Sequence, residues 1–104
     1  MSETALVAGC LVYLQSKGCM AWRNNTGGVR KGRHFIRFGH VGSSDIIGVG
    51  PGGFFIGVEC KRGSNTLTVL QQQFLDDVLT QGGWAVCVYS VDELEQVYRR
   101  RFGV

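Results

Sequence analysis

The stretch DIIGVGPGGFFIGVECKRG, residues 45–63, contains two apolar segments separated by a turn signal. The segments at 45–50 and 54–60 have the length and composition of buried β-strands, and the PGG between them is typical of a hairpin turn. Two strands joined by a tight turn run antiparallel, so the start of the first lies beside the end of the second. The stretch therefore predicts a hairpin that brings Asp45 within reach of Glu59.

Charged side chains stand at the open end of this hairpin. Side chains alternate between the two faces of a strand, so Glu59 and Lys61 point to one face while Cys60 points to the other. Neighbouring carboxylates repel each other unless a cation lies between them, and a hard divalent ion such as Mg²⁺ prefers oxygen ligands. From the residues alone, Asp45, Glu59 and Lys61 form either a cation site or an ion cluster at the surface end of a sheet.

Helices are predicted on both sides of the hairpin. Apolar residues at helical spacing predict a first helix over residues 3–17, with Ser2 as its N-cap and Gly18 as its end. Thr68 is the expected N-cap of a second helix that ends at Gly82-Gly83. A capping box, Ser90 to Glu93, opens a third helix that runs to about Arg101.

Further strands are predicted at 19–24 and 34–39, and the almost wholly apolar segment 84–90 predicts a central strand. The glycine-rich, basic segment 26–33 predicts a mobile loop or a hairpin arm. The order of elements indicates one α/β domain over residues 1–104, in which a mixed β-sheet is flanked by helices. The sheet would hold a hairpin followed by a strand that is reached through a helical crossover.

Composition excludes several classes of protein. A hydrophobic content of 44% argues against large-scale disorder, and no apolar run reaches the roughly 18 residues that a membrane span needs. The glycine-rich GVGPGG at 48–53 leads into a strand and not into a helix, so no nucleotide cofactor is expected. The four cysteines form no C-x-x-C pair, which predicts free thiols in a reducing, cytoplasmic compartment and makes a zinc site with His34 or His40 improbable.

Basic residues are clustered although the net charge is only +3. A polyanionic partner is compatible with such clusters, and a solvated face is an equally good interpretation of the C-terminal run taken alone. The candidates for contacts to nucleic acid are Arg23, Arg30, Lys31, Arg33, Arg37 and Arg62, and the C-terminal run is Arg99, Arg100 and Arg101.

The spelling GSSDIIG…GGFFIGVECKRG resembles the core of the PD-(D/E)XK nucleases, in which an Asp is followed by Glu-x-Lys on a neighbouring strand. More narrowly it resembles the virus-type replication-repair nuclease (VRR-NUC) domain, and LTVLQQQFLDDVLTQGGWAVCV at 67–88 is similar to the helix and strand that follow in that family. The resemblance implies a restriction-endonuclease-like fold. Ser44 stands where many members have proline.

The resemblance also implies roles for individual residues. Asp45 and Glu59 would hold one or two Mg²⁺ or Mn²⁺ ions, with the main-chain carbonyl of Cys60 as a further ligand. Lys61 would orient the attacking water or stabilise negative charge that develops on the phosphate. Glu3 on the first helix is similar to the family's N-terminal acid and would add a ligand. Gln71, in preference to Gln72 or Gln73, matches the glutamine that positions the lysine or the nucleophile.

The function implied by the resemblance is hydrolysis of phosphodiester bonds in branched DNA. Members of this kind resemble Holliday-junction resolvases, so we expect a C2 homodimer that acts in a bacterial or phage-infected cell. Flap, nicking or restriction-type cleavage and a catalytically silent nucleic-acid-binding module are the alternatives. No second reader domain and no membrane association are expected.

Overall fold

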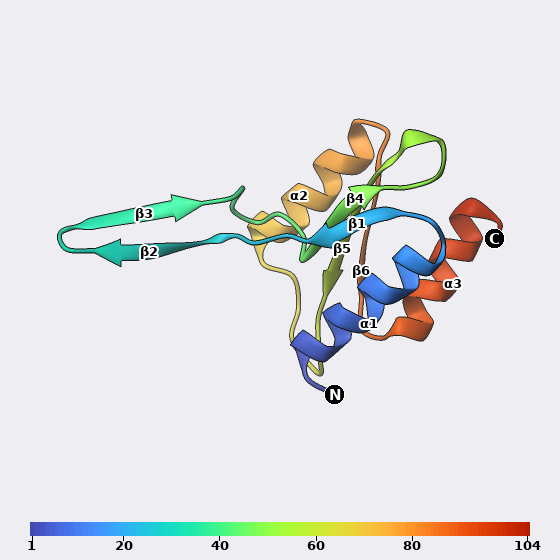
Figure 1. Cartoon of the computed structure of the whole chain (residues 1–104), viewed down its shortest axis with the longest axis horizontal. Coiled ribbons are helices and arrows are strands. Elements are labelled where there is room, and N and C mark those ends of the chain that lie inside the picture. The colour runs from blue at the N-terminus through green and yellow to red at the C-terminus, as the bar shows by residue number, and fades with distance from the viewer.

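A four-stranded mixed β-sheet lies at the centre of the computed structural model, which describes all residues from 1 to 104 (Figure 1). Its strands lie in the order β1-β4-β5-β6. The first two pairings are antiparallel and the pairing of β5 with β6 is parallel. The bounds are β1 Met20–Arg23, β4 Ile46–Val49, β5 Phe55–Cys60 and β6 Trp84–Val88.

The predicted hairpin joins β4 and β5 through a short 3₁₀ turn, Pro51–Gly53. Gly52 and Gly53 have φ angles of 71° and 83°, which glycine adopts without the steric cost that a side chain would bring. The turn leads into the strand β5 and not into a helix, as the sequence predicts. The helix α2, Val69–Thr80, then crosses from β5 to the parallel strand β6, as expected.

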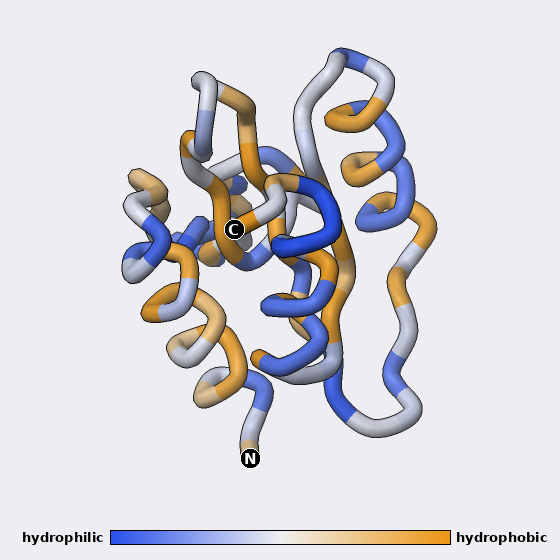
Figure 2. The backbone as a smooth tube through the Cα atoms, turned by 90° about the vertical axis from the view of Figure 1, so that its right-hand side faces the viewer, coloured by the Kyte–Doolittle hydropathy of each residue, from blue (hydrophilic) through white to orange (hydrophobic).

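Helices cover both faces of the sheet. The helices α1, Glu3–Ser16, and α3, Val91–Phe102, pack on one face, and α2 packs on the other. Hydrophobic stretches of the strands run between these layers (Figure 2). The main core lies under α1 and α3 and includes Leu6, Cys10, Leu14, Ile56, Val58, Cys60, Leu94 and Tyr98. The α/β class with a mixed sheet flanked by helices is thus confirmed.

A separate two-stranded sheet projects from this body as an arm (Figure 1). It is formed by β2, Gly27–Lys31, and β3, His34–Phe38, which pair with each other and not with the main sheet. Of the two interpretations of segment 26–33, the hairpin arm is confirmed. The molecule measures 51 × 32 × 23 Å along its principal axes, and the arm lies along the longest.

The prediction of a central strand at 84–90 is wrong, because β6 lies at the edge of the sheet and pairs only with β5. Its apolar composition has another cause. Both faces of β6 are covered, by α2 on one side and by α3 on the other, so Trp84, Ala85 and Val88 are buried without a second neighbouring strand. The apolar composition of a strand indicates that its two faces are buried, but it does not indicate whether the strand lies in the centre or at the edge of the sheet.

Side chains cap each helix at its start. Ser2 and Ser90 accept hydrogen bonds from the main-chain N–H groups of Ala5 and Glu93, at 3.1 and 3.0 Å. The carboxyl group of Glu93 accepts from the N–H of Tyr89 and not of Ser90, so the predicted capping box is displaced by one residue on that side. None of the three helices has the length and apolar character required to cross a lipid bilayer.

Candidate active site

The ladder between β4 and β5 sets Asp45 opposite Glu59. The ladder ends with the pair Ile46 and Val58, and extending its register by one position places Asp45, just before β4, opposite Glu59 on the other face from that core pair. The carboxylate Oδ2 of Asp45 accepts a hydrogen bond of 2.8 Å from the main-chain N–H of Cys60. The acid is thereby held against the end of β5, at the same place as Glu59.

Asn24 orients the segment that carries Asp45. Its main-chain N–H donates to the carbonyl of Asp45 at 2.7 Å. Its side-chain Nδ2 donates to Ser43 Oγ at 2.6 Å and to the carbonyl of Ser44 at 2.9 Å. Asn24 is a site residue that no sequence motif indicates, and the only signal for it is a polar residue directly after a short strand.

Ser44 constrains the segment before β4 through a side-chain hydrogen bond. The side chain is buried, and its hydroxyl donates to the carbonyl of Ile46 at 2.8 Å. The hydroxyl oxygen also lies where a Cβ on Gly57 would meet it at 2.9 Å, so the serine fits only beside a glycine. Ser44 therefore ties the start of β4 to the face of β5.

Glu59 is a carboxyl group in an environment that disfavours its charge. It is only 3% exposed. Burial, followed by a hydrogen bond with Asp45 and the negative charge of Asp45, raises the pKa of Glu59 from its ordinary value of 4.5 to about 9. The positive charge of Lys61 acts in the opposite direction, and the charge of Glu3 adds to the rise. A raised pKa favours the protonated form of Glu59, which can donate a hydrogen bond to the carboxylate of Asp45.

Two neighbouring carboxyl groups of this kind can bind a divalent cation. The cation would displace the proton from Glu59 and neutralise the negative charge of both groups. Asp45 and Glu59 provide oxygen ligands, the kind that Mg²⁺ and Mn²⁺ prefer. No group of three or more His, Cys, Asp or Glu side chains is assembled in the arrangement of a metal site. Any further oxygen ligand would have to come from Glu3, a main-chain carbonyl or water.

The other residues of the Glu-x-Lys motif lie as strand alternation requires. The thiol of Cys60 is fully buried in the core, where a hydrogen bond with Cys10 is the largest of the effects that raise its pKa. Only the main chain of Cys60 therefore remains available to the site. Lys61 is half-buried on the side of Glu59, and its main-chain N–H donates to the carbonyl of Val88 at 3.1 Å.

Glu3 and Gln71 come from the two layers of helices. Glu3 is the first residue of α1, is exposed, and lies close enough for its charge to act on Glu59. The Oε1 atom of Gln71 accepts from the N–H of Thr68 at 3.0 Å, which completes a capping box at the start of α2. The amides of Gln72 and Gln73 donate to Asp76 and Asp77 on the exposed side of the same helix.

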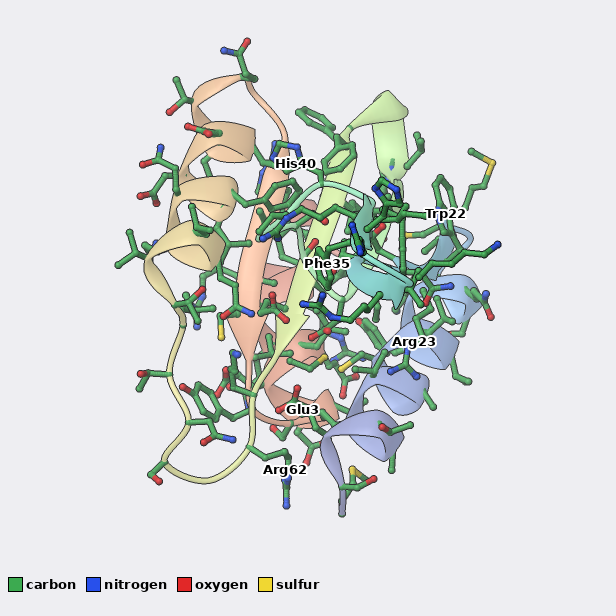
Figure 3. All side chains as sticks on the ribbon, turned by 90° about the vertical axis from the view of Figure 1, so that its left-hand side faces the viewer. Glu3, Trp22, Arg23, Phe35, His40 and Arg62 are labelled. Atoms are coloured by element: carbon green, nitrogen blue, oxygen red, sulfur yellow. The ribbon has the colours of Figure 1, made fainter.

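The predicted basic residues separate into three places. Arg30, Lys31, Arg33 and Arg37 are brought together on the exposed arm, whose strands are β2 and β3. Arg23 ends β1 at the base of the arm. Arg62 is distant from both, beside the N-terminal end of α1 (Figure 3), where it lines a small pocket with Met1, Ser90 and Asp92.

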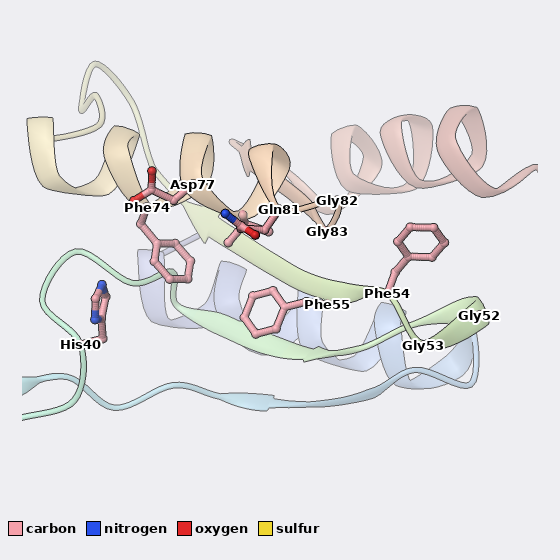
Figure 4. A pocket seen from close by; sticks show the side chains of 11 residues that line it. His40, Gly52, Gly53, Phe54, Phe55, Phe74, Asp77, Gln81, Gly82 and Gly83 are labelled. Atoms are coloured by element: carbon pink, nitrogen blue, oxygen red, sulfur yellow. The ribbon is translucent and has the colours of Figure 1, made fainter.

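A larger pocket of about 590 Å³ lies between α2 and the start of β5. In Figure 4 Phe74 and Asp77 on α2 lie on one side of it and Phe55 on the other, and His40 comes from the segment that returns from the arm. Phe55 shares a strand face with Glu59 but lies four residues earlier, about 13 Å along the strand at 3.3 Å per residue. Sequence reasoning missed this pocket because its walls come from three separated segments.

Comparison of the chain with models of known protein families finds no match, and comparison with curated protein sequences finds none either.

Proposed function

We propose that this protein is a metal-dependent endonuclease with a PD-(D/E)XK core of the VRR-NUC type, which hydrolyses phosphodiester bonds in branched DNA. The observation that carries the proposal is that the Asp45 carboxylate is bound to the end of β5 and interacts with Glu59 there, where the charge of Lys61 also acts. A buried Glu59 beside a partly buried Asp45 is costly to keep unless the pair serves a purpose such as cation binding.

The residues of the chain would divide the chemistry among them. Asp45 and Glu59 would hold one or two Mg²⁺ or Mn²⁺ ions, with the carbonyl of Cys60 and the carboxylate of Glu3 as further ligands. The bound metal supplies a Lewis acid that lowers the pKa of a coordinated water. Lys61 would donate a hydrogen bond to the phosphate oxygen that gains negative charge, or orient the attacking water. Asn24 would keep Asp45 in position.

Gln71 would act from α2. Its Oε1 is engaged by Thr68, but its Nε2 donates no hydrogen bond within the chain and is free to orient Lys61 or the nucleophile. A glutamine that serves both as a cap and as a site residue has its side-chain rotamer restricted by the cap. That restriction would lower the entropy cost of positioning the amide group.

The arm would bind the backbone of the substrate. Its four basic side chains match a polyanion, and contacts to phosphates contribute affinity without reading sequence. Selection by the shape of a branch is therefore favoured over selection by sequence. A four-way junction has two equivalent strands to cut, so we expect a C2 homodimer with one site per strand.

A cleavage panel of a four-way junction, a flap and a linear duplex, with Mg²⁺, Mn²⁺ or EDTA, tests the proposal. Wild type is expected to cut the junction with metal and to be inactive in EDTA. Lys61→Ala should abolish cleavage while junction binding in Ca²⁺ survives. Lys17→Ala is the matched control, because Lys17 is equally half-buried but lies at the C-terminal end of α1.

Each other outcome of the panel has a defined meaning. Preference for the flap or for the duplex retains the nuclease but replaces the substrate class. If wild type binds the junction and cuts nothing with either metal, the protein is a catalytically silent binding module. Cleavage that is unaffected by Lys61→Ala would show that the catalytic site is not the one formed by Asp45, Glu59 and Lys61.

A further inference from the structure

The two faces of the arm differ in chemistry. Residues that pair across an antiparallel ladder point to the same face, so the rungs Gly27–Phe38 and Val29–Ile36 share one face with the rung Lys31–His34 at the tip. We call Val29, Ile36 and Phe38 the apolar face of the arm. Their side chains are 52%, 48% and 48% exposed, although each is large and hydrophobic.

The opposite face of the arm is basic. It is formed by the rungs Arg30–Phe35 and Gly28–Arg37. The guanidinium of Arg37 lies over the ring of Phe35, 5.3 Å from its centroid. This cation–π contact stabilises the basic face without a partner molecule. The apolar face has no such internal partner, and a two-stranded hairpin alone is at best marginally stable in water.

A surface complementary to the arm exists on the same molecule. The 590 Å³ pocket is walled by the aromatic rings of Phe54, Phe55 and Phe74, and Asp77 lies at its edge. His40 places this pocket at the base of the arm (Figure 4). The tip of the arm carries Lys31 and Arg33 on either side of a tight glycine turn.

The arm and the helix α2 lie in stretches of the chain that carry charges of opposite sign. Residues 4–44, which include the arm, contain no Asp or Glu, and residues 64–98, which include α2, contain no Lys or Arg. Asp76 and Asp77 are therefore the charged residues of α2, and no basic side chain within 64–98 balances them. The only ion pair of the chain joins Glu95 and Arg99 on α3, so none of these charges is neutralised internally.

We propose that the occupant of the apolar face and of the pocket is a second copy of this chain, through reciprocal exchange of arms. The two arms would lie antiparallel with their apolar faces in contact. Each tip would then reach the base of the partner arm, where Lys31 meets Asp77 at the edge of the pocket. Such a contact is isologous and closes after two copies.

A nucleic acid is the less favoured occupant of these surfaces. Phosphates would be repelled by Asp76 and Asp77, and the apolar face offers no positive charge to them before the tip. The exchanged arrangement uses Lys31 in the interface and leaves Arg30 and Arg37 outward, so that in the dimer these two residues of each arm remain free for DNA. This interface rests on the proposed homodimer, but it needs neither metal nor cleavage.

Light scattering coupled to size-exclusion chromatography of the full chain, without metal or DNA, tests the interface. Wild type is expected to be a dimer. Ile36→Glu, which places a charge in the apolar face, should raise the dimer dissociation constant by about tenfold or more. Arg37→Gln is the matched control, since it changes net charge by the same amount on the opposite face and should leave the dimer intact.

Two further experiments, a swap of charges between positions 31 and 77 and a cross-link between them, test whether the tip of the arm contacts the pocket edge at Asp77. They remain informative even where one variant folds poorly. Asp77→Lys should weaken the dimer, and the combination with Lys31→Glu should restore it. In a Cys87→Ser background, Lys31→Cys together with Asp77→Cys should form a covalent dimer on oxidation. Either cysteine alone should not, because the two tips of antiparallel arms are far apart.

Three results would overturn the interface. One is a wild-type monomer at every soluble concentration. Another is a dimer that tolerates Ile36→Glu and gives no cross-link between positions 31 and 77, which would place dimerisation elsewhere. The third is association only after DNA is added, which would assign the apolar face to nucleic acid. None of these results bears on whether the metal site cuts DNA.

Discussion

Raising the pH of the metal-free protein is expected to destabilise it, because Glu59 must then lose a proton next to Asp45. The folded state holds this proton up to a pKa of about 9, whereas the unfolded chain releases it near 4.5. Stability from this group is fully present below pH 4.5 and is lost as the pH rises toward 9. Each pH unit in that window lowers the free energy of unfolding by about 1.4 kcal/mol, so about 3 kcal/mol is lost by pH 7.

Urea denaturation in EDTA, followed by circular dichroism between pH 5 and pH 8.5, measures this slope. Glu59→Gln replaces the protonated acid by a neutral isostere and should flatten the profile. Glu95→Gln is the control, because Glu95 is a partly exposed partner of Arg99 and should retain the wild-type slope. An identical slope in wild type and Glu59→Gln would refute the raised pKa of Glu59 and, with it, the close contact between Glu59 and Asp45.

The same titration reports metal binding without any DNA. Mn²⁺ or Mg²⁺ would displace the proton from Glu59, so it should stabilise wild type at pH 8 and have little effect at pH 5. At a metal concentration of about 100 times the dissociation constant the gain is about 2.7 kcal/mol. Glu59→Gln should lose most of this gain. Equal stabilisation of both proteins would show that the ion binds elsewhere.

Three further substitutions test the framework around the site. Gly48→Ala should destabilise the fold by about 2 kcal/mol or more in urea denaturation, because a Cβ there would stand 2.7 Å from Ala21 Cα in the neighbouring strand; an unchanged midpoint would show that β1 can move aside. Asn24→Ala should lower the cleavage rate even at temperatures where the variant is fully folded, because it releases the Ser43–Ser44 segment that positions Asp45. A folded variant with the wild-type cleavage rate would make Asn24 a purely structural residue. Thr68→Ala removes the cap of α2 and should cost about 1 kcal/mol by thermal denaturation, with no change if the cap is dispensable.

Local patterns predicted most of the elements because their causes are local. Ser2, Thr68 and Ser90 cap helices through contacts within three residues. The hairpin at 45–60 followed from its turn residues, and the two-residue period of a strand separated Cys60 from Glu59. Even the juxtaposition of the two acids needed only the register of one tight turn.

Contacts between distant segments were decided by tertiary structure. The edge position of β6 could not be read from its apolar residues, because helices bury a strand as completely as neighbouring strands do. The pairing of 34–38 with 27–31 outside the main sheet, the separation of Arg62 from the other basic residues, and the pocket beneath α2 depend on how layers pack. The sequence by itself determined which residues carry charge, which form turns and which neighbouring segments pair. Only packing decided which distant residues meet, because burial and long-range proximity are properties of the assembled layers and not of any single segment.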